Sequence, residues 1–142
     1  MITVEDLMTT ELETLNINDS MGRARELMAE RHIRHIPIID DDGRFVGLLT
    51  QRDVLANTIS LLAGIDSKEQ HSIEHNIPVE QIMTRDIATV GDDLSLKHAA
   101  GYLIDHKYGC LPVLKEGVLI GIVTETDFMK MVIHMLDQIE QT

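Results

Sequence analysis

The feature that most constrains the fold is an internal repeat that covers most of the 142 residues. At an offset of 75 positions, identical residues recur as Val4/Val79, Glu5/Glu80, Met8/Met83, Thr9/Thr84, Thr14/Thr89, Ser20/Ser95, Ala24/Ala99 and Pro37/Pro112. One residue is then lost, and at an offset of 74 the identities continue as Gly43/Gly117, Gly47/Gly121, Thr50/Thr124 and Asp53/Asp127. Because the single deletion falls where a hairpin turn is expected, the pattern indicates a duplicated folding unit.

Hydrophobic periodicity predicts the same order of elements in each copy, which is a strand, a helix, a β-hairpin and a second helix. In the first copy these lie at 13–15, 20–31, 35–39 with 45–49, and 50–62, after a short helical turn at 3–6. In the second copy they lie at 88–90, 93–106, 110–114 with 118–123, and 125–139. We therefore predict an α+β fold of two β-α-β-β-α repeats.

The repeat also predicts the domain organisation. The first repeat would occupy residues 1–62, the second 78–142, and a polar, partly mobile linker 63–77. A unit of about 55 residues has little core of its own. We therefore expect the two repeats to pack together around a pseudo-two-fold axis into one module.

Composition limits the partners of the chain. Its net charge of −12 disfavours nucleic acids and anionic membrane surfaces, because both attract Lys and Arg. Cys110 is the single cysteine, so no intrachain disulfide can form. The sequence shows no basic-then-apolar leader and no apolar run near the ~20 residues of a membrane span. We expect a cytoplasmic protein that binds neither nucleic acid nor membrane.

Both copies contain a glycine, two apolar residues and Thr-x-x-Asp, at 47–53 and 121–127. The motif places Thr50 and Asp53, and again Thr124 and Asp127, at a helix start, where free N–H groups and the helix dipole favour a phosphate. The carboxylate can accept hydrogen bonds from ribose hydroxyls. Thr-x-x-Asp is also a capping box, worth ~1 kcal/mol without any ligand. We expect both roles in at least one turn.

Taken in order, the motifs resemble the cystathionine β-synthase (CBS) domain. Each copy has Met-Thr, a Thr before an apolar strand, a helix, a proline-containing strand at 36–40 or 111–114, and then Thr-x-x-Asp. Two such domains in tandem, here over about residues 3–135, resemble a free-standing Bateman module. The resemblance implies a regulatory module for an adenosine-containing ligand, such as AMP, ADP or ATP, and in some members S-adenosylmethionine or a dinucleotide.

In CBS pairs each ligand cleft combines Thr-x-x-Asp of one repeat with residues of the other. Carried over, the first cleft would contain Arg34, His35, Thr50, Arg52, Asp53, Thr84, Thr89, Tyr108 and Gly109. The second would contain Thr9, Thr14, Ile33, Arg34, Gly109, Cys110, Thr124, Thr126 and Asp127. Thr126 and Cys110 replace Arg52 and His35 in the second cleft, so we expect the Asp53 cleft to bind phosphates more tightly.

Several of these residues have a structural alternative. Arg34 and His35 could instead blunt an exposed strand edge, and Tyr108 could pack between the repeats. His71 and His75, at i and i+4, have a spacing that can chelate a metal on a helix. With no cysteine nearby and a linker that need not be helical, we interpret them as surface residues and predict no metal site.

The sequence offers no nucleophile with a base and no acid–base pair, so we expect no enzyme activity and no catalytic cofactor. The helices after the two turns carry apolar residues that in the family form a dimer face: Leu55, Leu62, Met129, Met131 and Met135. We expect a homodimer that signals to a regulated protein by a ligand-dependent change in repeat or dimer arrangement. The alternative is a ligand-free dimeric adaptor whose clefts are vestigial.

Overall fold

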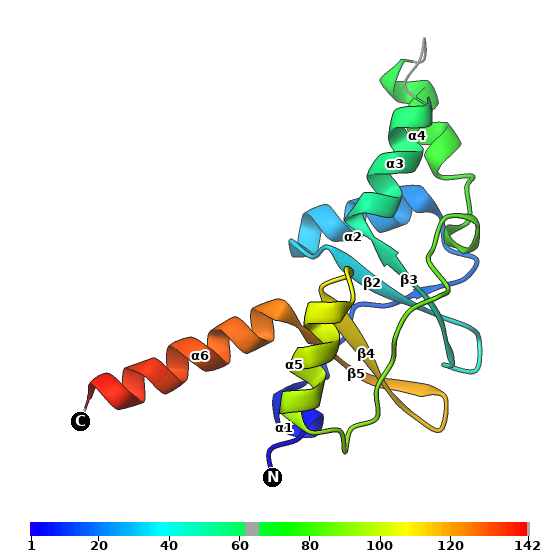
Figure 1. Ribbon diagram of the computed structural model, residues 1–142. Coiled ribbons are helices and arrows are strands. Elements are labelled where there is room, and N and C mark those ends of the chain that lie inside the picture. Colours follow the sequence, from blue (N-terminus) through cyan, green and yellow to red (C-terminus); the bar gives the residue numbers. More distant parts are fainter. Residues whose placement is uncertain (62–65, 142) are drawn as a thin grey trace. The chain divides into compact units, whose positions relative to one another are not determined.

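The structure is a computed structural model that describes residues 1–61 and 66–141 (Figure 1). Its mixture of helices and strands confirms the α+β class. In chain order the elements are α1 (Val4–Leu7), β1 (Leu15–Asn16), α2 (Met21–Arg31), β2 (His35–Ile39), β3 (Phe45–Thr50), α3 (Gln51–Leu61), α4 (Ser67–Glu74), the 3₁₀ helix η1 (Val79–Gln81), α5 (Leu96–Asp105), β4 (Cys110–Lys115), β5 (Val118–Thr124) and α6 (Glu125–Glu140).

The repeat is visible in the helix caps. Ser20 begins α2 by accepting a hydrogen bond from the Arg23 N–H at 3.0 Å, and Ser95 begins α5 by accepting one from the His98 N–H at 3.2 Å. A serine at this position satisfies one of the otherwise unpaired N–H groups of the first turn. The predicted helices, the two hairpins and the first strand of copy one are found close to their expected ranges. The strand predicted at 88–90 is wrong, because within this range the structure has no strand and Val90 forms an isolated bridge with Val113. The predicted end of the third helix at Leu62 lies outside the described residues.

The chain divides into two compact units whose boundaries differ from those of the sequence repeat. Residues 13–87 form one unit, here called the Asp53 unit. Residues 1–12 and 88–142 form the other, here called the Asp127 unit. Each copy has a Met-Thr segment, Met8-Thr9 in the first and Met83-Thr84 in the second. Each unit thus contains the Met-Thr segment of the opposite copy. The domains at 1–62 and 78–142 follow the repeat and stay a prediction.

Strand pairing is equivalent in the two units. In the Asp53 unit, β2 pairs with β1 in parallel and with β3 in antiparallel orientation, and Thr84 forms an isolated bridge with Leu48 of β3. In the Asp127 unit, β4 and β5 are antiparallel. Val90 bridges β4 in parallel, and Thr9 bridges Ile122 of β5. The Met-Thr segment therefore lines the same strand edge in both units.

Each unit has its own hydrophobic core, built from aliphatic side chains because aromatic residues make up only 3% of the sequence. In the Asp53 unit the buried core residues are Leu15, Met21, Ala24, Leu27, Met28, Ile36, Ile38, Leu49, Val54 and Val79. In the Asp127 unit they are Val4, Val90, Leu96, Ala99, Leu103, Leu111, Val113 and Val123. Val4 and Val79 come from opposite copies, so the exchanged segments contribute to both cores.

The segment expected to be a polar linker contains a helix that the hydrophobic pattern does not predict. Residues 67–74 form α4, which packs against α2. Asp66 caps this helix by accepting a hydrogen bond from the Glu69 N–H at 2.8 Å. The remaining part of the predicted linker that precedes Asp66 lies outside the described residues.

A buried carboxylate anchors α4. The side chain of Glu74 is 5% exposed and accepts hydrogen bonds from Arg25 Nε at 3.0 Å and from a terminal Arg25 nitrogen at 2.6 Å. Thr58 of α3 and Gln70 of α4 donate to the same carboxylate, at 3.2 and 3.3 Å. Burial alone would raise the pKa of Glu74, but these hydrogen bonds and the Arg25 charge together lower it below its ordinary value.

Gly121 tests the packing of a Met-Thr segment, and Gly101 serves as its control. A Cβ on Gly121 of β5 would lie 2.6 Å from Met8 Sδ and 3.2 Å from the Thr9 carbonyl oxygen. We expect Gly121→Ala to lower the free energy of unfolding by about 1–3 kcal/mol, because strands cannot easily separate to admit the methyl group. Gly101→Ala in α5 meets nothing within 4 Å and should stabilise by about 0.5–1 kcal/mol. Urea denaturation measures both, and a stabilising Gly121→Ala would contradict this packing.

Candidate functional site

The turn from β3 into α3 is a capping box. The Thr50 N–H donates to Asp53 Oδ2 at 2.9 Å, and the Asp53 N–H donates to Thr50 Oγ1 at 3.1 Å. Each residue therefore satisfies a backbone group of the other at the start of the helix. The capping role considered for this motif is confirmed, and it orients the Asp53 carboxylate by a backbone contact.

Thr84 joins this turn from the other copy of the repeat. Its backbone pairs with Leu48 through two hydrogen bonds, of 2.8 and 2.9 Å. The pairing brings the Thr84 hydroxyl to 3.3 Å from Asp53 Oδ1 and 3.4 Å from Oδ2. Three of the residues predicted for the first cleft, Thr50, Asp53 and Thr84, therefore lie together within the Asp53 unit.

The Asp127 unit repeats this arrangement. The Thr124 N–H donates to Asp127 Oδ2 at 2.9 Å, and the Asp127 N–H donates to Thr124 Oγ1 at 3.2 Å. Thr9, paired in the backbone with Ile122, places its hydroxyl 3.4 Å from Asp127 Oδ1. Thr9, Thr124 and Asp127, all predicted for the second cleft, therefore lie together.

The segment before each central strand also reaches the turn. The Arg34 carbonyl accepts a hydrogen bond from the Gln51 N–H at 2.9 Å, and the Gly109 carbonyl accepts one from the Glu125 N–H at 3.1 Å. These contacts place Arg34 beside the first turn and Gly109 beside the second, where both were predicted. They also correct one expectation, because the first N–H of each helix is already paired. A phosphate here would depend more on side-chain cations than on free backbone N–H groups.

His35 and Cys110 lie opposite the threonines of the turns. His35 pairs with Thr50 across β2 and β3, and Cys110 pairs with Thr124 across β4 and β5. Burial, with a smaller effect from the charge of Glu125, raises the pKa of Cys110 to about 12. The thiol is therefore protonated at neutral pH and behaves as the small buried hydrophobe that the sequence predicts.

The other predicted residues divide between the units. Thr89, Tyr108 and Gly109 of the first cleft belong to the Asp127 unit, whereas Thr14, Ile33 and Arg34 of the second belong to the Asp53 unit. Arg52 and Thr126 each occupy the second position of their helix, and both are exposed. The assignment of all these residues to ligand contacts stays a prediction from the family resemblance.

The two turns have the chemistry of a polyol site. Asp53 and Asp127 are half-buried, so each remains accessible while its orientation is fixed by the cap. An ionised carboxylate has about four acceptor sites. At Asp127 the described contacts are one backbone N–H and one long hydroxyl contact, which leaves capacity for further donors such as a pair of ribose hydroxyls.

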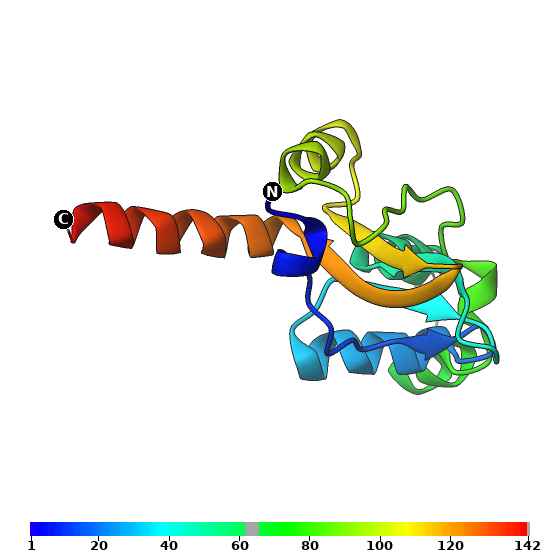
Figure 2. The ribbon, with the colours of Figure 1, turned by 90° about the horizontal axis from the view of Figure 1, so that it is seen from below.

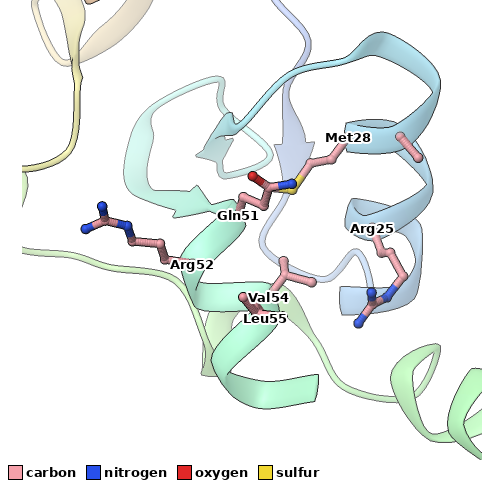
Figure 3. Close-up of a pocket in the computed structure, with 7 residues that line it drawn as sticks. Arg25, Met28, Gln51, Arg52, Val54 and Leu55 are labelled. Atoms are coloured by element: carbon pink, nitrogen blue, oxygen red, sulfur yellow. The ribbon is translucent and has the colours of Figure 1, made fainter. Parts of the chain in front are cut away.

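A shallow pocket of about 330 Å³ lies between α2 and α3 (Figure 3). Figure 3 shows Gln51 directed toward Met28, while Arg52 extends away from them. Of the residues predicted for the first cleft, Arg52 alone lines this pocket, and the Thr50-Asp53-Thr84 group does not. Its lining is Arg25, Met28, Ala29, Gln51, Arg52, Val54 and Leu55.

The methionines have a packing role in this arrangement that we did not predict from the sequence. Met8 and Met83 lie against Gly121 and Gly47, where an added Cβ would come within 2.6 and 2.8 Å of the respective sulfur. The recurrence of Met-Thr and of the glycine at matching offsets was the available signal. Within the described ranges 1–61 and 66–141, no helix has the length and apolar character needed to cross a membrane.

Comparison with solved structures gives the same architecture. A Vibrio cholerae protein named for acetoin utilization (AcuB) is 36% identical with a TM-score of 0.81, over 100% of this chain and 98% of that one. CBSX2, a CBS-pair protein of Arabidopsis thaliana, was solved in complex with AMP and is 30% identical with a TM-score of 0.80, over 95% and 98%. A CBS domain pair with 5′-methylthioadenosine and S-adenosyl-L-methionine is 25% identical with a TM-score of 0.75, over 93% and 96%.

Some relatives known by sequence are much longer than this chain. An uncharacterized protein of Methanocaldococcus jannaschii is 34% identical over 131 residues, which cover 89% of this chain but 31% of the relative. A homoserine O-acetyltransferase of Methanococcus vannielii is 30% identical over 85% of this chain, yet the match covers 23% of that enzyme. The chain thus spans a minor part of these relatives. The CBS domain model matches residues 4–59 and 79–134, and the chain belongs to the CBS domain family as a tandem pair.

Proposed function

We propose that this CBS pair is a regulatory module that binds an adenine nucleotide, AMP, ADP or ATP, at its two Thr-x-x-Asp turns. The observation that carries the proposal is the duplicated group of two threonines and one half-buried aspartate at each turn. Capping alone requires a threonine and an aspartate, and it gives no role to the second threonine from the opposite copy. The AMP and S-adenosyl-L-methionine complexes of similar CBS pairs support the same ligand class.

The Asp53 turn is the better phosphate site in this proposal. Arg34 lies beside this turn and Arg52 occupies the second position of α3, whereas the equivalent residues at the Asp127 turn are Gly109 and Thr126. Arginine binds phosphate through paired N–H donors, which neither of the equivalents can supply. We therefore expect AMP to fill the Asp53 turn at a lower concentration than the Asp127 turn.

Ligand-dependent stability tests the proposal. A ligand that binds the folded protein at 100 times its dissociation constant adds about 2.7 kcal/mol to the free energy of unfolding. We expect AMP to raise the melting temperature in a concentration-dependent manner, with guanosine 5′-monophosphate as the matched control. If AMP, ADP, ATP and S-adenosylmethionine all leave the melting temperature unchanged, the ligand-free adaptor becomes the better interpretation.

One observation favours an association role in addition to ligand binding. α6 extends away from the rest of the Asp127 unit (Figures 1 and 2), and none of its residues is buried. Its exposed apolar residues are Met129, Val132, Ile133, Met135, Leu136 and Ile139. Met131, expected on the same face, packs partly against the core instead. We propose that this apolar surface mediates homodimerisation, because contiguous exposed apolar residues mark interaction sites.

Sedimentation velocity tests the dimer. The wild-type protein should sediment as a dimer, and Ile133→Glu should shift it toward the monomer, because a charge would have to be desolvated at the interface. Lys130→Glu on the same helix is the control for added acidic charge and should change the distribution less. A wild-type protein that remains a monomer at all accessible concentrations would contradict this assignment.

A further inference from the structure

Helices α2 and α4 bring a carboxylate close to two histidines that lie 45 and 49 residues further along the sequence, and the nucleotide proposal uses none of the three. They are Glu26 of α2, His71 of α4 and His75 at the C-terminal cap of α4. One ligand-type atom from each lies within 4.8 Å of those of the other two. All three belong to the Asp53 unit and are at least partly accessible to solvent.

The hydrogen bonds of His75 determine which nitrogen faces the cluster. His75 Nδ1 lies 2.8 Å from the His71 carbonyl oxygen. Because a carbonyl can only accept, Nδ1 carries the hydrogen, and Nε2 of the neutral ring has the lone pair. This Nε2 lies 3.0 Å from Glu26 Oε1. A backbone carbonyl that fixes the tautomer in this way is the usual second contact of a metal-binding histidine.

His71 faces the same carboxylate oxygen. Its Nε2 lies 3.9 Å from Glu26 Oε1, and its ring stacks on that of His75 with centroids 4.0 Å apart. Two histidines at i and i+4 on one face of a helix are a recurrent zinc-binding pair. From sequence alone the pair is expected to be surface residues, because no cysteine lies nearby and the linker need not be helical. In the structure this segment is helical, as α4, and Glu26 of α2 supplies a carboxylate beside the two histidines.

Gly22 makes room for the histidine ring. It lies one turn before Glu26 on α2, and a Cβ built on it would come within 2.3–2.6 Å of three atoms of the His75 ring. Glycine inside a helix costs about 1 kcal/mol relative to alanine. The glycine is therefore explained by the His75 ring, which occupies the space that any side chain at position 22 would need.

We propose that Glu26, His71 and His75 form a binding site for a divalent transition-metal ion, for which Zn²⁺ is the fitting example. Two imidazole nitrogens and one carboxylate oxygen are a donor set that zinc accepts, with a fourth position left for water. Zinc–ligand bonds of about 2.0–2.2 Å would require small side-chain rotations to draw the three atoms together. Such rotations are available to exposed side chains such as His71, which is 69% exposed.

A metal at this position would tie α4 to α2. α4 lies in the segment that connects the two copies of the repeat, and at its C-terminal end the buried Glu74 already pairs with Arg25 of α2. A bound ion would add a second connection, on the solvent side of the same helix pair. The distance of 3.0 Å between His75 Nε2 and Glu26 Oε1 also fits a protonated histidine that donates to the carboxylate, which would be an ordinary ion pair without a metal. Metal titration separates these two cases.

The test is isothermal titration calorimetry of Zn²⁺ into the full-length protein after chelation and without nucleotide. We expect one strong site per chain in the wild type. The double variant His71→Gln/His75→Gln should bind at that site at least about 10-fold more weakly. Gly22→Ala keeps all three ligands, but its methyl group would occupy the space of the His75 ring. This variant should therefore also bind zinc more weakly. His98→Gln, an exposed histidine bonded to Ser95 on α5, is the control and should bind as the wild type does.

A second measurement does not depend on affinity. Amide hydrogen exchange in residues 66–76 should slow on addition of Zn²⁺ in the wild type and not in the double variant. Equal zinc binding by the wild type and the double variant would overturn the site, as would a wild type that binds no zinc. AMP binding is measured separately on zinc-free protein, so failure of the metal site is distinguishable from failure of the nucleotide proposal.

Discussion

Replacing Asp53 or Asp127 by alanine is expected to weaken AMP binding at the affected turn about 10- to 100-fold. Hydrogen bonds to a charged group are worth about 1.5–3 kcal/mol, and a factor of ten corresponds to 1.4 kcal/mol. If Asp53 holds the tighter ligand, Asp53→Ala should remove the high-affinity phase of an AMP titration, and Asp127→Ala should leave that phase in place. Equal losses in both phases would contradict the proposed asymmetry.

The chain contains its own control for loss of a helix cap. Thr3 and Asp6 form a third Thr-x-x-Asp capping box, in which the Thr3 N–H donates to Asp6 Oδ2 at 2.8 Å at the start of α1. This box does not follow a strand with the glycine motif. Asp6→Ala should therefore cost stability of about 1 kcal/mol but leave both phases of the AMP titration unchanged. If Asp6→Ala weakened AMP binding as much as Asp53→Ala, the effect of Asp53 would be attributable to folding.

Arg25→Ala is expected to produce the largest loss of stability among the charged residues described here. It would leave the Glu74 carboxylate, 5% exposed, without its ionic partner. Removing one member of a fully buried pair costs about 3–5 kcal/mol. Because the Arg25 side chain is 40% exposed, we expect a smaller loss of about 2–3 kcal/mol.

The control for Arg25 lies two residues earlier on the same helix. Arg23 makes exposed ion pairs, at 3.6 Å to Glu26 and 3.8 Å to Glu30. Arg23→Ala should change the free energy of unfolding by no more than about 0.5 kcal/mol. Guanidinium denaturation of both variants measures the difference, and similar losses would show that burial of Glu74 contributes little.

The same network predicts a pH dependence with a definite sign. The pKa of Glu74 is lowered in the folded protein from a reference value of 4.5. The ionised carboxylate of Glu74 therefore stabilises the fold at pH values above 4.5, and this stabilisation is lost as the pH falls through the pKa of the folded state. The stability difference between the wild type and Glu74→Gln should be full at neutral pH and should shrink below pH 4.5.

The sequence predicted the parts of the fold that repeat. The hairpins β2–β3 and β4–β5 match between the copies, as do helices α2 and α5 and helices α3 and α6, so the ambiguity of any single apolar run is reduced by its partner. The first strand does not match, because β1 of copy one corresponds to an isolated bridge at Val90. The Thr-x-x-Asp turns could also be predicted, because Thr50 and Asp53 are close in sequence and their capping chemistry is local. Thr84 and Thr9 were assigned to the two clefts by the family resemblance, and local pattern alone would not have identified them.

The parts that could not be predicted depend on contacts distant in sequence. α4 has no counterpart in the repeat, and its one buried residue, Glu74, is held by Arg25 of α2 and Thr58 of α3. Buried carboxylates are rare without a partner, and the partner of Glu74 is Arg25, which lies 49 residues earlier and cannot be found from a local pattern. Asp66 followed by Glu69 is a local signal for the start of this helix, but it lies in a polar segment without a clear apolar face.

The most direct test of the nucleotide proposal is native mass spectrometry of the purified protein with added AMP. We expect adducts of one AMP per chain at low concentration and two at higher concentration. Both adducts should be lost when Asp53 and Asp127 are replaced together by alanine. A wild-type protein that forms no adduct with AMP, ADP, ATP or S-adenosylmethionine, or a double variant that binds AMP as the wild type does, would contradict the nucleotide proposal.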